Sequence, residues 1–106
     1  MDIIVDIDGT LANCEHRLHH IKEKPKNWPA FFAACEDDAP IEPVVVMARA
    51  LHLSGHTLIF CSGRPEACRA ATQRWIEKHV GVPQNQRLYM RNDGDYRADD
   101  VVKREL

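Results

Sequence analysis

Two aspartates separated by one residue, Asp6 and Asp8, follow a short run of β-branched residues near the start of the chain. Carboxylates at this spacing can serve one phosphoryl site, if one attacks phosphorus and the other transfers the proton of the leaving group. The displacement would then be divided into the formation and the hydrolysis of an aspartyl-phosphate. The pair therefore indicates phosphoryl-transfer chemistry.

The residues around this pair extend the same interpretation. Two acids beside a phosphate would repel it, so a hard cation with oxygen ligands, best matched by Mg2+, would have to bridge them. Gly9 would let the backbone approach the phosphate, and Thr10 would offer it a hydroxyl and an amide. The alternative is that Asp8-Gly9 forms only a hairpin turn.

A strand over Ile3-Ile4-Val5 is the element that would position the two acids. Its unbroken β-branched character predicts a strand buried on both faces of a parallel sheet. Ligands of open parallel sheets bind beyond the carboxyl ends of the strands. Asp6 and Asp8 would lie at such an end.

The rest of the chain alternates between strand and helix patterns, apart from residues 11–40, which we expect to form a small cap-like insertion. Pro43 begins a helix that Ser54-Gly55 ends. The segment Ser62-Gly63-Arg64-Pro65 is expected to turn a second strand, 57–61, into another helix, which ends at Gly81. A third strand, 87–90, a polar loop, 91–95, and a helix from Ala98 to Leu106 follow. This order predicts one α/β domain over residues 1–106, with a Rossmann-like parallel sheet and flanking helices.

The bulk composition is that of a soluble globular protein, with 44% apolar and 28% charged residues among 106. The net charge of −2 argues against nucleic-acid binding through bulk positive charge, although a local basic cluster would remain compatible with it. The four cysteines form no C-x-x-C pair, so we expect reduced thiols in a cytoplasmic protein. We expect neither a secretory leader nor a membrane span, which would need roughly 20 apolar residues.

Three motifs in order carry a family resemblance. The segment Asp6-Ile7-Asp8-Gly9-Thr10-Leu11 resembles the first motif of the haloacid dehalogenase (HAD) superfamily. Ser62 after the second strand fits the second motif, and Lys103 in the last helix fits the third. The resemblance implies a HAD-like core and a magnesium-dependent phosphohydrolase.

Within that superfamily the chain most resembles the 3′-phosphatase domain of phage polynucleotide kinases, enzymes of nucleic-acid repair, and its stand-alone phage and bacterial relatives. The similarity is densest in residues 61–64 and 91–103. It implies that Asp6 is the nucleophile and Asp8 the general acid/base, that both hold Mg2+, and that the substrate is a phosphorylated nucleotide or a nucleic-acid 3′ end. The other implied residues are Lys103 as a catalytic residue, Asp99 as an acid that supports the site, and Gly9, Thr10, Arg17, Ser62, Gly63, Arg64 and Arg91 around the phosphate.

The chemistry of the cationic residues agrees with these roles. Arg64 can offer a fork of donors to phosphoryl oxygens, and Lys103 a point charge beside the nucleophile. Arg17, nine residues beyond Asp8, falls where these phosphatases keep another arginine. The alternative for all three is a solvated surface position.

One departure from the superfamily is evident, because a fourth motif with one or two metal-binding acids should follow the lysine at some distance. The chain stops at Leu106, three residues after Lys103. An alternative function is therefore a catalytically impaired module that binds phosphate or nucleotide, or that interacts with other proteins. The sheet would also keep an open edge, through which a second copy could pair.

Two further groups in the insertion have alternative interpretations. Cys14, His16, His19 and His20 resemble metal ligands, but we favour a polar rim because no second well-spaced pair is near. Aromatic residues at positions 28, 31 and 32 could stack on a base, although core packing is commoner. No G-x-x-x-x-G-K-[ST] loop exists, so phosphate transfer should be hydrolytic.

Overall fold

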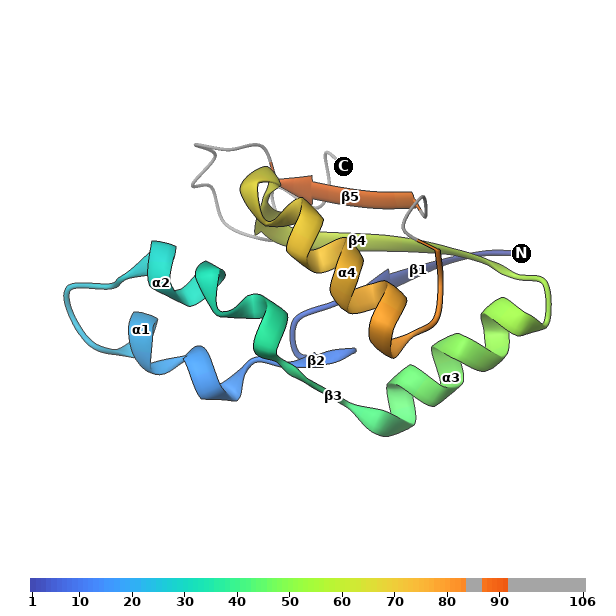
Figure 1. Ribbon diagram of the computed structural model, residues 1–106, viewed down its shortest axis with the longest axis horizontal. Helices are drawn as coiled ribbons and strands as arrows, with labels where there is room; N and C mark the ends of the chain where they lie inside the picture. The colour runs from blue at the N-terminus through green and yellow to red at the C-terminus, as the bar shows by residue number, and fades with distance from the viewer. Residues whose placement is uncertain (84–86, 92–106) are drawn as a thin grey trace.

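The fold is built on a parallel sheet of three strands in the order β1-β4-β5, in a computed structural model that describes residues 1–83 and 87–91 (Figure 1). Ile3 lies beside Leu58, and Phe60 beside Leu88, in the register of the sheet. The predicted α/β class with a parallel sheet is confirmed. The strands are β1 (Asp2–Asp6), β4 (Thr57–Pro65) and β5 (Arg87–Arg91).

Two long helices, α3 (Glu42–Leu53) and α4 (Arg69–His79), cover one face of this sheet (Figure 1). Along β4 the side chains alternate between buried and partly exposed positions, so Leu58 and Phe60 face the helices. Trp75 and Ile76 of α4 are buried against them, at 1% and 0% exposed. Burial of these apolar side chains is the main force that holds the layers together.

The prediction that β1 is buried on both faces is wrong. Ile4 is 75% exposed, whereas Ile3 and Val5, which point to the other face, pack against the core. The physical reason is position, because β1 has only β4 as a neighbour among the described strands, and both long helices lie on one side. A β-branched run can therefore form a strand that other elements cover on one face only.

Residues between β1 and α3 form a small unit beyond the carboxyl ends of β1 and β4 (Figure 1). Its ends meet in an antiparallel ladder of β2 (Ala12–Asn13) and β3 (Ala39–Pro40). Between them lie two short helices, α1 (His19–Lys22) and α2 (Trp28–Ala33), and two 3-10 turns, Glu15–Arg17 and Cys35–Asp37. This ladder brings the two ends of the expected insertion together beside the carboxyl edge of the sheet.

Two local expectations need correction. Helix α3 ends at Ser54 and Gly55, the latter at φ +94, as the stop signal predicts. Of the apolar positions expected at helical spacing in this helix, 44, 47, 48 and 51, position 47 does not pack against the core: Met47 is 64% exposed, whereas Val45 is buried. The strand β4 also extends to Pro65, and its pairing with β5 is irregular only beyond Cys61.

The predicted helix from Ala98 to Leu106 lies outside the described residues, as do positions 92–95 of the predicted loop. The four cysteines are free thiols, as expected. None of the helices in residues 1–83 and 87–91 is long and apolar enough to cross a membrane.

Candidate active site

The turn after β1 presents two aspartates at the carboxyl edge of the sheet. Asp6 is the last residue of β1 and lies beside Cys61 of β4. Ile7, which is fully buried, accepts hydrogen bonds at its carbonyl from the amides of Thr10, Leu11 and Ala12 at 2.9–3.1 Å. These bonds close a tight turn around the buried Ile7, so the backbone positions of Asp6 and Asp8 on either side of it are fixed.

Gly9 and Thr10 complete this turn. Gly9 has φ +80, which favours glycine, and its amide donates to the carbonyl of Ala12 at 2.9 Å. The Thr10 hydroxyl donates to Oδ2 of Asp6 at 3.4 Å, and its amide donates to Ile7. Their described contacts thus shape the loop and orient Asp6, and their contact with a phosphate stays a prediction.

Asp8 is held by the two arginines that the sequence singled out. Its Oδ1 accepts from Nη2 of Arg17 at 2.9 Å, and from Nε and Nη2 of Arg64 at 3.1 and 2.6 Å. The Asp8 side chain keeps 29% of its surface exposed. All of these bonds fall on Oδ1, which leaves Oδ2 as the oxygen that can carry a proton.

Asp38 is the site residue that the sequence did not reveal. Its side chain is fully buried, and Oδ1 accepts from Nε of Arg17 at 2.8 Å and from Nε2 of His16 at 2.6 Å. Its Oδ2 accepts from Nη2 of Arg17 at 2.8 Å and of Arg64 at 3.1 Å. Asp38 therefore bridges the two guanidinium groups behind Asp8.

We call Asp8, Arg17, Asp38 and Arg64 the arginine–aspartate cluster. It contains two positive and two negative side chains, which is the condition under which charges tolerate burial. Burial lowers the pKa of Arg17, but its hydrogen bonds with Asp38 and the charges of both aspartates outweigh this, so the pKa is raised. Arg17 therefore keeps its positive charge inside the fold.

The two arginines are not surface residues, which was the alternative for each. Both side chains have no exposed surface. Nη1 of Arg17 donates to the carbonyl of Phe31 at 3.3 Å, and the Phe31 ring lies 4.3 Å from its guanidinium carbon. Nη1 of Arg64 donates to the Thr72 hydroxyl at 3.0 Å. Each arginine also donates to Oδ1 of Asp8, so both position that carboxylate.

The second predicted motif lies next to this cluster. The hydroxyl of Ser62, a buried residue, accepts from the amide of Arg64 at 3.1 Å and fixes the backbone there. Arg91, at the end of β5, donates from Nε to the carbonyl of Gly63 at 2.9 Å. The structure thus brings Ser62, Gly63, Arg64 and Arg91 to one end of the sheet. Lys103 and Asp99 lie outside the described residues.

The acids at the sheet edge fit a hard cation by their chemistry, because Asp6 and Asp8 offer carboxylate oxygens. Within the described ranges no group of three or more His, Cys, Asp or Glu side chains forms a complete metal site. Oδ1 of Asp8 is already bonded to both arginines. Mg2+ keeps several waters in its shell, so Asp6 would hold the ion together with an oxygen of Asp8 that does not carry the proton, such as its backbone carbonyl.

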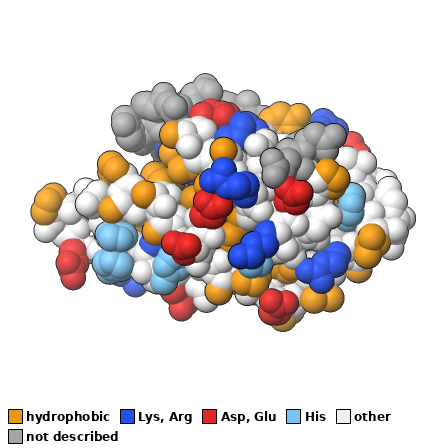
Figure 2. Space-filling model, in the orientation of Figure 1, with side chains coloured by type: hydrophobic (Ala, Val, Ile, Leu, Met, Phe, Trp, Pro, Cys, Tyr) orange, Lys and Arg blue, Asp and Glu red, His pale blue; other side chains and the backbone are white. Residues whose placement is uncertain are grey.

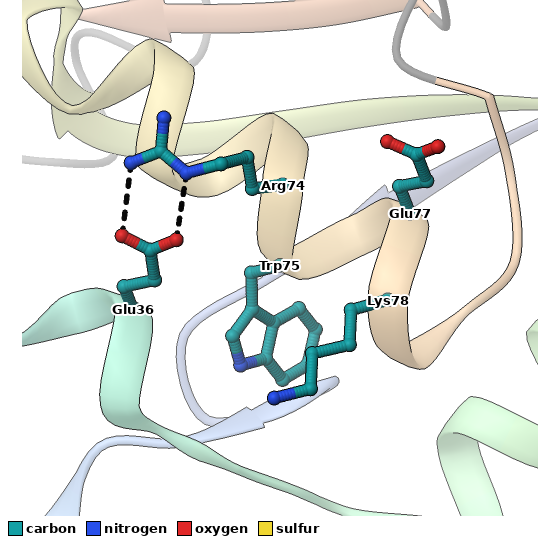
Figure 3. Close-up of a pocket in the computed structure, with 5 residues that line it drawn as sticks. All are labelled: Glu36, Arg74, Trp75, Glu77 and Lys78. Carbon is teal, nitrogen blue, oxygen red and sulfur yellow. Dashed lines mark hydrogen bonds and ion pairs between the residues drawn. The ribbon is translucent and has the colours of Figure 1, made fainter.

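An open pocket of about 450 Å³ lies elsewhere, on the outer side of α4 (Figure 3). A bidentate ion pair spans its rim, with Arg74 bonded to Glu36 at 2.7 and 2.9 Å. The Trp75 indole, which donates to the backbone carbonyl of Asp38 at 2.8 Å, forms its wall. None of the predicted site residues lines this pocket, which is formed by Glu36, Arg74, Trp75, Glu77 and Lys78.

Comparison with known protein families identifies the family of this chain. A family model described as the polynucleotide kinase PNKP phosphatase domain matches residues 1–106. The chain belongs to this family. The predicted relationship to HAD-type phosphatases is thereby confirmed.

Solved structures similar to this PNKP phosphatase domain agree with the assignment. A chain of the Pnkp1/Rnl/Hen1 complex is 29% identical with a TM-score of 0.77, and one of the Pnkp1/Rnl/Hen1 RNA repair complex is 28% identical with a TM-score of 0.73. These matches cover 99% of this domain but only 33% and 30% of the two chains. The domain therefore spans about a third of the length of these relatives.

A more distant solved structure shares the fold. The class C acid phosphatase from Bacillus anthracis with tungstate bound is 18% identical, with a TM-score of 0.71 over 98% of this domain and 45% of that chain. At this identity the likeness concerns the fold alone.

Proposed function

We propose that this domain is a Mg2+-dependent phosphomonoesterase that acts through an aspartyl-phosphate on Asp6, with a 3′-phosphorylated nucleic-acid end or a nucleotide as its substrate. The observation that carries this proposal is the fixed orientation of Asp8, whose Oδ1 receives three guanidinium N–H groups beside the carboxylate of Asp6. Membership of the PNKP phosphatase family supports it. The choice of a nucleic-acid end is supported by a relative in an RNA repair complex.

In the first step a carboxylate oxygen of Asp6 attacks phosphorus, and the bond from phosphorus to the leaving oxygen breaks. Oδ2 of Asp8, which none of the described hydrogen bonds engages, gives its proton to that oxygen. In the second step water attacks the aspartyl-phosphate, Asp8 takes a proton from the water, and the bond from phosphorus to Asp6 breaks. When bound, Mg2+ would neutralise the repulsion between the phosphate and the two acids.

Arg17, Asp38 and Arg64 serve both steps by holding Asp8, which is the member of the arginine–aspartate cluster that exchanges a proton. Arg17 and Arg64 hold Asp8 in one orientation, and Asp38 holds the two arginines. A preorganised acid avoids the cost of reorientation during the reaction, which is a large part of what enzymes supply. Direct contact of Arg17, Arg64, Ser62 or Arg91 with the phosphate would follow if the cluster opens toward a bound substrate.

The first test uses phosphate release from a 3′-phosphorylated oligonucleotide and from nitrophenyl phosphate. We expect release to require Mg2+, to stop after chelation, and to vanish in Asp6→Asn. Asp2→Asn is the matched control, since Asp2 lies exposed at the other end of β1. Release that persists in Asp6→Asn would contradict the mechanism. Phosphate binding without release in the wild type would favour the impaired binding module.

Asp8→Asn separates the two roles of Asp8. The proton donor is worth about 10²–10⁴-fold with a poor leaving group such as a nucleoside hydroxyl. Nitrophenol leaves without a proton, so Asp8→Asn should release it in a burst of about one equivalent, after which the slow hydrolysis of the aspartyl-phosphate limits turnover. Equal losses on both substrates, with no burst, would exclude Asp8 as the acid/base.

A further inference from the structure

The loop between α1 and α2 carries a concentration of positive charge in a chain whose net charge is −2. Lys22, Lys24 and Lys26 are all exposed. Residues 22–28 hold these three lysines against one glutamate, a local net charge of +2. Such a basic cluster attracts polyanions even when the whole molecule is acidic.

These lysine charges are not neutralised within the described structure. The ion pairs of residues 1–83 and 87–91 engage four arginines and one histidine, and none of them involves a lysine. Arg74 on α4, for comparison, is bonded to Glu36 at 2.7 Å. The lysines of the loop are therefore available to an external anion.

Trp28 adds an aromatic surface to the same loop. It is 40% exposed, whereas the other tryptophan, Trp75, is 1% exposed. Its ring lies nearly parallel to that of Phe32, with 5.8 Å between the centroids and 23° between the planes. Nζ of Lys26 lies 5.8 Å from the Trp28 ring centroid. An aromatic ring beside cations is how proteins hold single-stranded nucleic acid.

The loop is tied rigidly to the phosphoryl site. The amide of Asn27 donates to the carbonyl of His20 at 2.7 Å, and its side chain caps α2 by accepting from Ala30 at 3.2 Å. Phe31 of α2 then packs on Arg17, which holds Asp8. Both helices lie beyond the carboxyl ends of the strands (Figure 1), and histidine side chains gather over α1 (Figure 2).

We propose that Lys22, Lys24, Lys26 and Trp28, which we call the lysine–tryptophan surface, bind the single-stranded nucleic acid that leads away from a 3′ end held at Asp6. The lysines would contact backbone phosphates and Trp28 would stack on a base. An acidic protein or an anionic membrane has no planar bases for the exposed indole. Only the direction of the bound strand, with its 3′ end at Asp6, rests on the proposed function. Binding of the strand to this surface does not.

The test measures binding apart from turnover. Wild-type protein is titrated with single-stranded oligodeoxythymidylates that end in a 3′-hydroxyl, while tryptophan fluorescence is recorded. We expect quenching, because Trp28 is exposed and Trp75 is buried. We also expect affinity to rise from the dinucleotide to the dodecanucleotide, since only the longer strand reaches from the site to the loop. Trp28→Phe should abolish the quenching, and Trp28→Ala, which removes the aromatic ring, should weaken binding about tenfold.

The charge contribution is read from the salt dependence. Each of Lys22→Gln, Lys24→Gln and Lys26→Gln should lower the slope of log K against log salt by about 0.7. Glu23→Gln should strengthen binding, because it removes the one negative charge of the loop. Lys78→Gln, an exposed lysine on α4, is the matched control and should leave affinity and slope unchanged. Urea unfolding of each variant checks that the fold is kept.

Three results would overturn the inference. These are lysine variants with the affinity and slope of Lys78→Gln, quenching that persists in Trp28→Phe, and binding of phosphatidylserine vesicles as tight as that of the dodecanucleotide. Ester hydrolysis without oligonucleotide binding would remove this inference and leave the proposed function standing. Oligonucleotide binding without hydrolysis of any ester would do the reverse.

Discussion

Asp38 is the residue on which the geometry of the site depends most. It is a fully buried carboxylate, and it accepts hydrogen bonds from Arg17, Arg64 and His16. Removal of one member of a buried ion network leaves the other charges without compensation, which costs more than the net contribution of the intact network. The function of Asp38 is thus to make the burial of two guanidinium groups tolerable beside Asp8.

We expect Asp38→Ala to lower the free energy of unfolding by about 3–5 kcal/mol, because two buried cations would then face Asp8 alone. Urea unfolding measures this loss. Asp37→Asn is the matched control, since Asp37 is exposed in the same turn, and its effect should stay within about 0.5 kcal/mol. Equal effects of the two substitutions would show that Asp38 is solvated in solution.

At the level of elements, helix α4 connects the sheet to the insertion. Trp75 fills the core from α4, and its indole nitrogen donates to the backbone carbonyl of Asp38 at 2.8 Å. Thr72, one turn earlier, accepts from Arg64. One helix therefore fixes the end of the insertion and one of the arginines at the same time, so packing and site geometry depend on the same contacts.

Trp75→Phe tests this connection. The substitution removes a buried hydrogen bond and part of the side-chain volume, and we expect a loss of about 2 kcal/mol in the free energy of unfolding. Phosphatase activity should fall further than the unfolded fraction explains, because the backbone of Asp38 loses its anchor. Arg74→Gln, on the exposed side of α4, should have little effect on either measurement. If the phosphatase activity of Trp75→Phe falls only as much as its folded fraction, the proposed connection between Trp75 and the site through Asp38 is rejected.

At the scale of the whole molecule, the sheet leaves β1 with a single neighbour among the described strands. Its outward face carries Ile4, which is 75% exposed, and Tyr89, which is 40% exposed on β5. An uncovered strand edge with apolar side chains is a surface on which another strand can pair. Among the described residues, the face of the sheet that carries Ile4 and Tyr89 is thus apolar next to the edge of β1.

We expect this surface to promote self-association, seen as a concentration-dependent sedimentation coefficient that Ile4→Lys reduces to that of a monomer. Val46→Lys adds the same charge at an exposed position of α3 and should leave sedimentation unchanged. A wild type that sediments as a monomer at all concentrations would rule out pairing through β1. Activity of Ile4→Lys then shows whether association matters for the chemistry.

Local patterns in the sequence predicted the main strands and helices and the family. The β-branched run before Asp6, the glycine stop after α3 and the spacing of Asp6 and Asp8 each act over a few residues, so each could be predicted. The resemblance of Asp6-Ile7-Asp8-Gly9-Thr10 predicted the family that the whole chain matches. These signals need no knowledge of what lies across the fold.

Tertiary structure alone decided which charges meet. Asp38 lies 21 residues beyond Arg17 and 26 before Arg64. As the last of three consecutive acids, it looks in the sequence like a solvated residue. Burial of β1 was likewise misjudged, because the covering of a face depends on where the helices pack. Hydrogen bonds and packing between distant segments leave no periodic trace in the sequence, so only the folded chain assigns Arg17 and Arg64 to Asp8.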